Sequence, residues 1–123
     1  MGIATKLFLG ATLESGIDLV LELAQIERYL ENLDWLITGE GKLDEQTLSG
    51  KTIQGLLNRT KSSQRKVAAF CGQSTLTAEQ IESLGIDHID SVAAYAHDLD
   101  DAINNTATYL EKLTINFLPR LSL

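Results

Sequence analysis

The sequence predicts an α/β fold, a parallel sheet of about three strands flanked by helices in a Rossmann-like arrangement. Short apolar, partly β-branched runs alternate with segments whose apolar residues recur at helical spacing. The connections between these runs are long enough for helices, which implies right-handed crossovers and parallel strands. A length of 123 residues fits one compact domain. We therefore expect a single α/β domain over residues 1–123.

The amino-terminal third is expected to be helical. Residues 1–9 carry apolar side chains at helical spacing but no capping signal. Ser15 then opens a helix, with Asp18 three residues later as a carboxylate variant of the capping box. The apolar face of this helix is formed by Ile17, Val20, Leu21 and Ala24. A second short helical segment carries Tyr29, Leu30 and Leu33.

Two strands are expected in the middle of the chain. Residues 35–38 form a short apolar run that ends at Gly39, and residues 67–71 form a second run that is closed by a turn at residues 72–74. Between them a polar loop leads into an amphipathic helix. The side chains expected to point inward from that helix are Ile53, Leu56, Leu57 and Thr60.

The remaining elements follow from caps and spacing. Thr77 and Gln80 form a capping box for a helix that stops at Gly85, and residues 88–92 predict a weaker third strand. One last helix is expected, capped by Asp98 and ended by Pro119, with inward residues Leu99, Ile103, Thr106, Leu110, Leu113 and Phe117.

Composition excludes several classes of function. A formal net charge of −7 argues against general nucleic-acid binding, which needs a cationic surface. No apolar run reaches membrane-spanning length, and the amino end lacks a signal-peptide pattern, so we expect no membrane partner and a cytoplasmic location. Cys71 is the single cysteine, which excludes an internal disulfide, and its apolar neighbours predict a buried core position.

Positive charge is nevertheless concentrated in one segment. Six of the ten basic residues lie in it: Lys42, Lys51, Arg59, Lys61, Arg65 and Lys66. This local excess can attract a small anion such as a phosphate or a carboxylate. For Arg59 and Lys61 the alternative is that they complement the carboxyl end of a helix dipole.

The polar loop after the first strand is the candidate site. Gly39 and Gly41 flank Glu40, so we expect a sharp turn and close approach of a ligand. In open α/β sheets, ligands gather at the carboxyl ends of strands. Glu40 and Asp44 can coordinate Mg²⁺ carried by a nucleotide, or accept a proton from an attacking hydroxyl. The alternative is that Asp44 and its neighbour Glu45 only favour the start of the next helix.

Neutral polar groups follow these acids. Gln46, Thr47 and Ser49 can orient a polyhydroxy substrate, although Ser49 is equally suited to cap the next helix. Residues 50–52 resemble the end of a P-loop, but Glu45 stands where that motif requires glycine. What remains is a helix amino end with the ammonium of Lys51, which suits an anion. The two histidines, His88 and His97, form no triad or metal cluster, and we expect solvated or capping roles.

The loop resembles a known family. The run 37–44, continued by residues 46–47 and 49–51, is similar to the signature of bacterial glycerate kinases of the first type. Residues 10–21 are similar to the stretch before that signature, and residues 67–72 resemble the next core strand and turn. Members of the family are longer, with two α/β domains, and this chain resembles only their carboxyl-terminal portion.

The resemblance implies a function. It implies ATP-dependent phosphorylation of D-glycerate to phosphoglycerate, with Mg²⁺ and ATP as cofactor and co-substrate. Glu40 or Asp44 would hold the cation or take the hydroxyl proton, and Lys51 would offset phosphate or carboxylate charge. The substrate- and phosphate-binding residues would be Gly39, Gly41, Gln46, Thr47, Ser49 and Lys51. The alternative is a non-catalytic domain that binds anions weakly and self-associates as a homodimer, through a sheet edge or through the apolar start around Ile3, Leu7 and Phe8.

Overall fold

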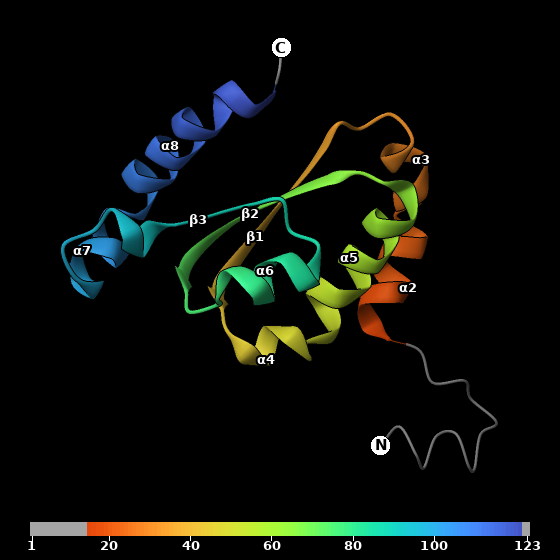
Figure 1. The fold of residues 1–123 in the computed structure, drawn as a ribbon, viewed down its shortest axis with the longest axis horizontal. Coiled ribbons are helices and arrows are strands. Elements are labelled where there is room, and N and C mark those ends of the chain that lie inside the picture. The colour runs from red at the N-terminus through yellow and green to blue at the C-terminus, as the bar shows by residue number, and fades with distance from the viewer. Residues whose placement is uncertain (1–14, 122–123) are drawn as a thin grey trace.

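Three parallel strands form the centre of the molecule (Figure 1). The computed structural model describes residues 15–121. The strands β1 (Trp35–Leu43), β2 (Lys66–Ser74) and β3 (His88–Ser91) lie in the order β1-β2-β3, and both pairs are parallel. Helices lie between successive strands, as right-handed crossovers require. The predicted α/β class with a three-stranded parallel sheet is confirmed.

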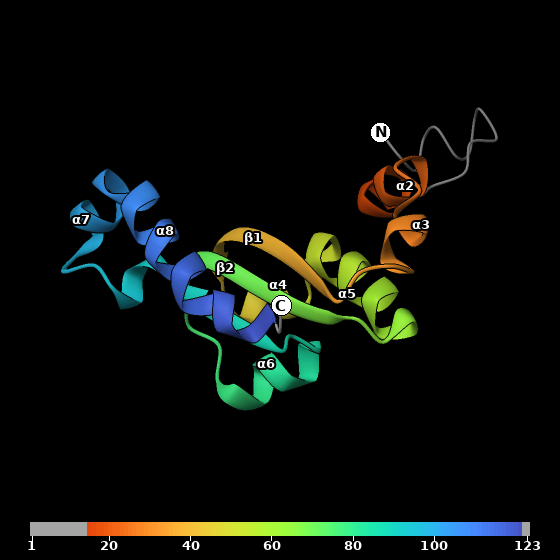
Figure 2. The same ribbon diagram turned by 90° about the horizontal axis from the view of Figure 1, so that it is seen from above.

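Helices cover both faces of this sheet. They are α2 (Gly16–Leu23), α3 (Ile26–Leu30), α4 (Glu45–Leu48), α5 (Lys51–Ser63), α6 (Ala78–Leu84), α7 (Leu99–Asn104) and α8 (Thr106–Phe117), with 3₁₀ turns η1 (Val92–Ala94) and η2 (Leu118–Leu121). Seen from above, α8 runs along the sheet on the side away from α5 (Figure 2). Helices α2 and α3 lie beside α5 rather than against the strands.

Alternation along β2 separates two apolar layers, because successive side chains of a strand point to opposite faces. On one face Val67, Ala69 and Cys71 are buried against α5 and α6. On the other face Phe70 packs edge-on against Phe117 of α8, with ring centroids 5.5 Å apart. The buried partners on the first face include Leu43, Ile53, Leu57, Leu84 and Ile86. The sheet therefore has a core on each side.

Both long strands extend beyond their predicted ends. β1 continues to Leu43 and β2 to Ser74, because the pairing of the two strands runs through Gly39↔Phe70 to Leu43↔Ser74. The sharp turn expected at the first glycines is therefore wrong, as is the turn expected at residues 72–74. Among the described glycines, only Gly85, which ends α6 as predicted, has a positive φ, at 80°.

The backbones of β1 and β2 come close together at a pair of glycines, Gly41 and Gly72. A Cβ atom added to Gly72 would lie 2.7 Å from the carbonyl oxygen of Gly41, closer than real Cβ contacts occur. The register of the two strands passes from Glu40↔Cys71 to Lys42↔Gln73, so Gly41 and Gly72 are not among the paired residues. Gly72 is thus required by the approach of two backbones.

Substituting Gly72 by Ala is expected to lower the free energy of unfolding by about 1–3 kcal/mol, because the obstructing atom belongs to the backbone. Gly41→Ala is the matched control, since a Cβ there meets nothing within 4 Å. Urea denaturation of the two variants measures the difference. Equal losses for both would show that the contact does not matter.

The amino-terminal helix differs from its prediction. Ser15 precedes α2 but makes no side-chain capping hydrogen bond, so the expected capping box is wrong. Asp18 is instead 3.7 Å from Arg59 of α5, which also pairs with Glu27 of α3. These ion pairs fix α2 and α3 to α5. Residues 1–9, expected to be helical, lie outside the described part of the chain.

The apolar face predicted for α2 is only half buried. Leu21 is buried and Ile17 half-buried, whereas Val20 is 60% exposed and Ala24 is exposed. The reason is that α2 contacts mainly α5 and α3, so only one narrow side is covered.

The last helix is broken in two. Asp98 caps it as predicted, its Oδ1 accepting a hydrogen bond from the Asp101 amide at 2.8 Å. The helix then ends near Asn105, whose side chain bonds to Asp101, while the Thr106 hydroxyl donates to the Ala102 carbonyl at 2.6 Å. These local side-chain bonds compete with a continuous helix.

The break changes which residues are buried. Ala102, Tyr109, Leu113 and Phe117 face inward. Of the predicted inward stripe, Leu99, Ile103 and Leu110 are exposed by 70%, 64% and 38%, and Thr106 is exposed as well. The prediction holds only for the last turn of α8. Between residues 15 and 121, no helix has the length and apolar character that crossing a membrane requires.

Candidate active site

Hollows surround the carboxyl ends of β1 and β2. One of about 390 Å³, here called the carboxylate hollow, lies between β1 and the starts of α4 and α5. Its lining residues are Glu40, Lys42, Asp44, Gln46, Thr47, Gly50, Thr52 and Ile53. Four of the eight predicted site residues line this hollow, namely Glu40, Asp44, Gln46 and Thr47. The strand pairing and the α4 cap fix their positions. The structure therefore brings Glu40 and Asp44 to one hollow.

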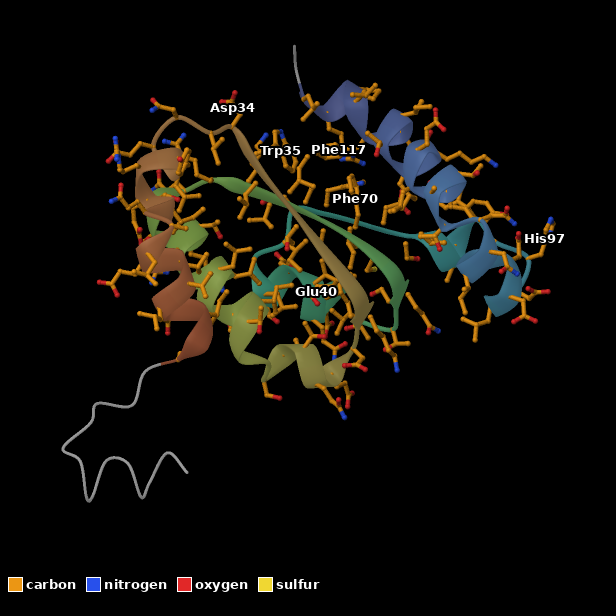
Figure 3. All side chains as sticks on the ribbon, turned by 180° about the vertical axis from the view of Figure 1, so that it is seen from behind. Asp34, Trp35, Glu40, Phe70, His97 and Phe117 are labelled. Atoms are coloured by element: carbon orange, nitrogen blue, oxygen red, sulfur yellow. The ribbon has the colours of Figure 1, made fainter. Side chains whose placement is uncertain are left out.

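Glu40 is held by the sheet rather than by a loop. It is half-buried near the carboxyl end of β1, opposite Cys71 in the register, and Figure 3 shows it well removed from Asp34 and Trp35 at the start of the strand. None of the ion pairs formed by the side chains that the structure describes, which exclude that of Lys51, involves its carboxylate. That carboxylate is thus oriented by a rigid element.

Asp44 has a structural role, as the helix-start alternative expected. Its Oδ1 accepts a hydrogen bond from the Gln46 amide at 3.0 Å, and its own amide donates to Thr47 Oγ1 at 3.0 Å, which completes a capping box for α4. Its Oδ2 lies 3.3 Å from Lys42 Nζ. The hydrogen bond with Lys42, followed by that with Gln46, lowers the pKa of Asp44 below its ordinary value. The carboxylate is therefore held in its ionised form.

Some of the neutral polar residues predicted for the site line the hollow, and others stabilise the ends of α4. Thr47 contributes its hydroxyl oxygen to the α4 cap, and Gln46 is exposed at the rim of the hollow. Ser49 donates to the Gln46 carbonyl at 3.2 Å and ends α4. The alternative that it caps the next helix is wrong, because Gly50 occupies that position. Lys51 is the first residue of α5.

The glycines border a second hollow. Gly39 and Gly41 line a space of about 450 Å³ between β1, β2 and α8. A Cβ on Gly41 would meet nothing within 4 Å. The expected open approach to the backbone is therefore present even though the expected turn is not.

Most of the basic cluster supports the fold instead of the site. Arg59 pairs with acids of α2 and α3, so its helix-dipole alternative is wrong. Lys61 lies in the last turn of α5, as that alternative places it, and donates to the Ser83 carbonyl at 3.2 Å. Arg65 donates to the Glu31 carbonyl, and Lys66 lies 5.3 Å from the centre of the Trp35 ring. Of the cluster's side chains that the structure describes, only that of Lys42 lines the carboxylate hollow.

Comparison with known proteins adds a decisive observation. The sequence profile of the Glycerate kinase family matches residues 1–122 of the 123. The chain belongs to the glycerate kinase family. It is 35% identical to a glycerate kinase of Bacillus subtilis (strain 168) over 112 residues, which cover 91% of this chain and 29% of the relative. It is 31% identical to the glycerate 2-kinase of Escherichia coli (strain K12), covering 100% of this chain and 32% of the relative.

A solved structure supports the same assignment. The chain superposes on part of a crystal structure assigned to glycerate kinase 2 of Salmonella typhimurium LT2, with a TM-score of 0.63 and 29% sequence identity. The match covers 100% of this chain and 32% of that one. This glycerate kinase family chain therefore spans about a third of the length of the relatives it matches.

The remaining candidate groups of this family member are structural. Cys71 is buried, and burial, then the charges of Asp90 and Glu40, raise the pKa of its thiol to about 11, so the predicted core role is confirmed. His88 packs between Phe70 and Phe117, with ring centroids 6.3 and 5.1 Å away. Its predicted solvated or capping role is wrong, and burial, followed by the charge of Arg120, lowers the pKa of its imidazole.

Sequence reasoning missed a cluster around Asp101. Its Oδ2 accepts hydrogen bonds from Tyr109 Oη at 2.6 Å and from the His97 amide at 2.9 Å, and its Oδ1 accepts from Asn105. The bond from Tyr109, then those from His97 and Asn105, lowers the pKa of Asp101 to about 2. Asp101 lies on α7 and Tyr109 on α8, so the pairing of residues three or four positions apart on one helix does not predict their contact.

We expect the Asp101 cluster to make stability pH-dependent in acid. The pKa of this carboxyl group is about 3.9 in the unfolded chain and about 2 in the folded protein. The stabilisation is therefore complete above about pH 4 and is lost as the pH falls toward 2. Asp101→Asn should lower the urea midpoint at pH 7, and its deficit should shrink between about pH 4 and 2. Glu111→Gln, at an exposed position of α8, is the control. A deficit that does not change with pH would contradict this explanation.

Proposed function

We propose that this chain forms one wall of the active site of an ATP-dependent glycerate kinase, which transfers the γ-phosphoryl of Mg-ATP to D-glycerate. The supporting observation is the carboxylate hollow, where Glu40, Lys42 and Asp44 meet at the carboxyl end of a parallel strand in a chain of this family. Because the chain spans about a third of its relatives, we expect it to be the carboxyl-terminal portion of the enzyme and to turn over slowly by itself.

Glu40 is the better proton acceptor of the two acids. Asp44 is committed to Lys42 and to the α4 cap, and its lowered pKa makes it a weaker base. Glu40 makes no ion pair with the described side chains and is held on a strand. In the proposed step, Glu40 accepts the proton of the glycerate hydroxyl as the oxygen attacks phosphorus and the bond to ADP breaks.

The residues present fit a magnesium ion carried by ATP. Such ions are bound in proteins through one or two carboxylates together with phosphate oxygens and water. Asp44, kept ionised by Lys42, offers a hard oxygen ligand at the same hollow in which Glu40 would accept the proton. When bound, the ion would neutralise part of the negative charge of the phosphates. Asp44 would hold it, while Lys42 and the free amides at the start of α5 would orient the anionic groups of the substrates.

The polar rim is proposed to bind substrate. Gln46 and Thr52 line the carboxylate hollow and can bond to the hydroxyl and carboxylate groups of glycerate. The roles predicted for Ser49 and Lys51 stay predictions from the sequence. Gly39 and Gly41 would let a phosphate approach the β1 backbone closely.

The non-catalytic alternative also has an observation in its favour. β1 is an edge strand of the described sheet, and its Ile37 is 52% exposed. An uncovered edge can pair with the same edge of a second copy. Light scattering distinguishes the cases, because a monomer at all concentrations would leave self-association without support.

The kinase proposal is tested by a coupled assay for ADP release with D-glycerate and Mg-ATP. The chain is measured beside a longer chimera, in which it is joined to the part of the Bacillus subtilis glycerate kinase outside the matched 29%. Turnover in the chimera at a rate well above that of the chain alone is the expected result. A folded chimera without activity would overturn the proposal.

A further inference from the structure

A hollow of about 350 Å³ lies at the opposite end of the strands from the carboxylate hollow and is here called the amino-end hollow. Figure 3 shows Asp34 and Trp35 at the start of β1, well away from Glu40. The volume is within the range of small-molecule sites. The proposed kinase function uses none of its lining residues, which come from the starts of β1 and β2, the end of α5 and η2: Asp34, Trp35, Gln64, Arg65, Lys66 and Leu121.

Opposite charges face the amino-end hollow without neutralising one another. Arg65 and Lys66 bring two cations to it, and Asp34 brings a carboxylate. All three side chains belong to the described part of the chain, yet Asp34 forms no ion pair with either cation. Trp35 and Lys66 are partners in the strand register, so the residues just before them, Asp34 and Arg65, enter the same two strands. Unpaired charges of both signs around one space suit a ligand that itself carries both signs.

The two cations are held in place by contacts of their own. Arg65 Nη2 donates a hydrogen bond to the Glu31 carbonyl at 2.6 Å, which uses only one of the five N–H groups of a guanidinium. Lys66 Nζ lies 5.3 Å from the centre of the Trp35 ring, a contact that restricts an otherwise flexible side chain. Gln64 ends α5 with a φ of 56° and adds an amide group to the lining. Such preorganisation reduces the entropy lost when a ligand binds.

We propose that the amino-end hollow binds a free α-amino acid with a polar side chain, whose carboxylate binds Arg65 and Lys66 and whose ammonium group binds Asp34. A guanidinium can bind a carboxylate through two parallel hydrogen bonds, which makes Arg65 the main anchor. Gln64 offers an amide to the polar side chain of the ligand, and the Trp35 ring offers apolar surface to its methylene groups. This inference does not rest on the proposed kinase function, because the amino-end hollow and the carboxylate hollow share no lining residue.

Titration calorimetry of the chain tests the assignment with L-glutamine and with two analogues that each lack one of its charges. Glutaramic acid lacks the ammonium group, and 4-aminobutanamide lacks the carboxylate. The fluorescence of Trp35, the single tryptophan, reports on the hollow directly. The variants are Asp34→Asn and Arg65→Gln, and the matched controls are Asp100→Asn and Arg28→Gln, at exposed positions outside the hollow. Circular dichroism checks that all four fold.

We expect L-glutamine to bind with a change in Trp35 fluorescence, and each analogue to bind at least about tenfold more weakly, because it lacks one charge-assisted contact. Asp34→Asn should remove most of the difference between L-glutamine and glutaramic acid, and Arg65→Gln most of that between L-glutamine and 4-aminobutanamide. The controls should change the affinities less than about twofold. Glutaramic acid binding as tightly as L-glutamine would overturn the inference in favour of a simple anion site. No binding of L-glutamine, or equal losses in variants and controls, would also overturn it.

Discussion

Glu40→Gln is expected to lower the kcat of the glycerate kinase chimera by about 10²–10⁴-fold, the usual contribution of a general base. The amide keeps the size of the side chain and its place on β1 but cannot accept the proton of the attacking hydroxyl. Since the carboxylate makes no ion pair with the side chains that the structure describes, stability should change little. Steady-state assays of ADP release, together with urea denaturation, measure both quantities.

Two neighbouring acids provide the controls. Glu45→Gln, at an exposed position in the first turn of α4, should leave kcat within about threefold. Asp44→Asn preserves a capping residue, so the helix should persist, but it should raise the Mg²⁺ concentration needed for half-maximal rate and also cut kcat by orders of magnitude. Glu40→Gln should leave that Mg²⁺ requirement nearly unchanged. Near-normal turnover of Glu40→Gln would rule out Glu40 as the base.

The fold class could be predicted because its signals are local. The apolar runs at β1 and β2, and the Thr77–Gln80 capping box, depend on residues within a few positions of one another. The ends of the strands could not be predicted in this way. β1 continues through Gly39–Leu43 because β2 lies beside it, and that pairing joins residues about thirty positions apart.

The sequence predicted which residues lie in the candidate site better than it predicted what each of them does there. Glu40 and Asp44 are close in the sequence, so a single loop or strand end had to bring them near each other, and they line one hollow. The sequence also offered, as an alternative, the role of Asp44 at the start of α4, which the structure shows. The placing of His97 and Gln73 in one hollow could not be predicted, because it depends on the packing of η1 against β2, between residues far apart in the sequence.

Phe117→Ala is expected to lower the free energy of unfolding by about 3–5 kcal/mol, as large-to-small substitutions in a packed core do. Phe117 is 1% exposed and forms the centre of an aromatic cluster. Its ring lies 5.1 Å from that of Trp35 and 5.5 Å from that of Phe70, both edge-on, and 5.1 Å from the His88 ring. Urea denaturation followed by the fluorescence of Trp35, the single tryptophan, measures the loss.

Two further variants separate packing from mere size. Phe117→Leu keeps much of the volume but not the edge-on contacts, and should cost less than the alanine variant. Leu118→Ala, at the adjoining 49% exposed position, should cost less than about 1 kcal/mol. Equal losses at positions 117 and 118 would show that α8 is not anchored by the cluster. Because Phe117 joins α8 to Trp35 of β1 and Phe70 of β2, the alanine variant should also loosen α8 where it borders the space of about 450 Å³ beside Gly39 and Gly41, without removing any group that lines that space.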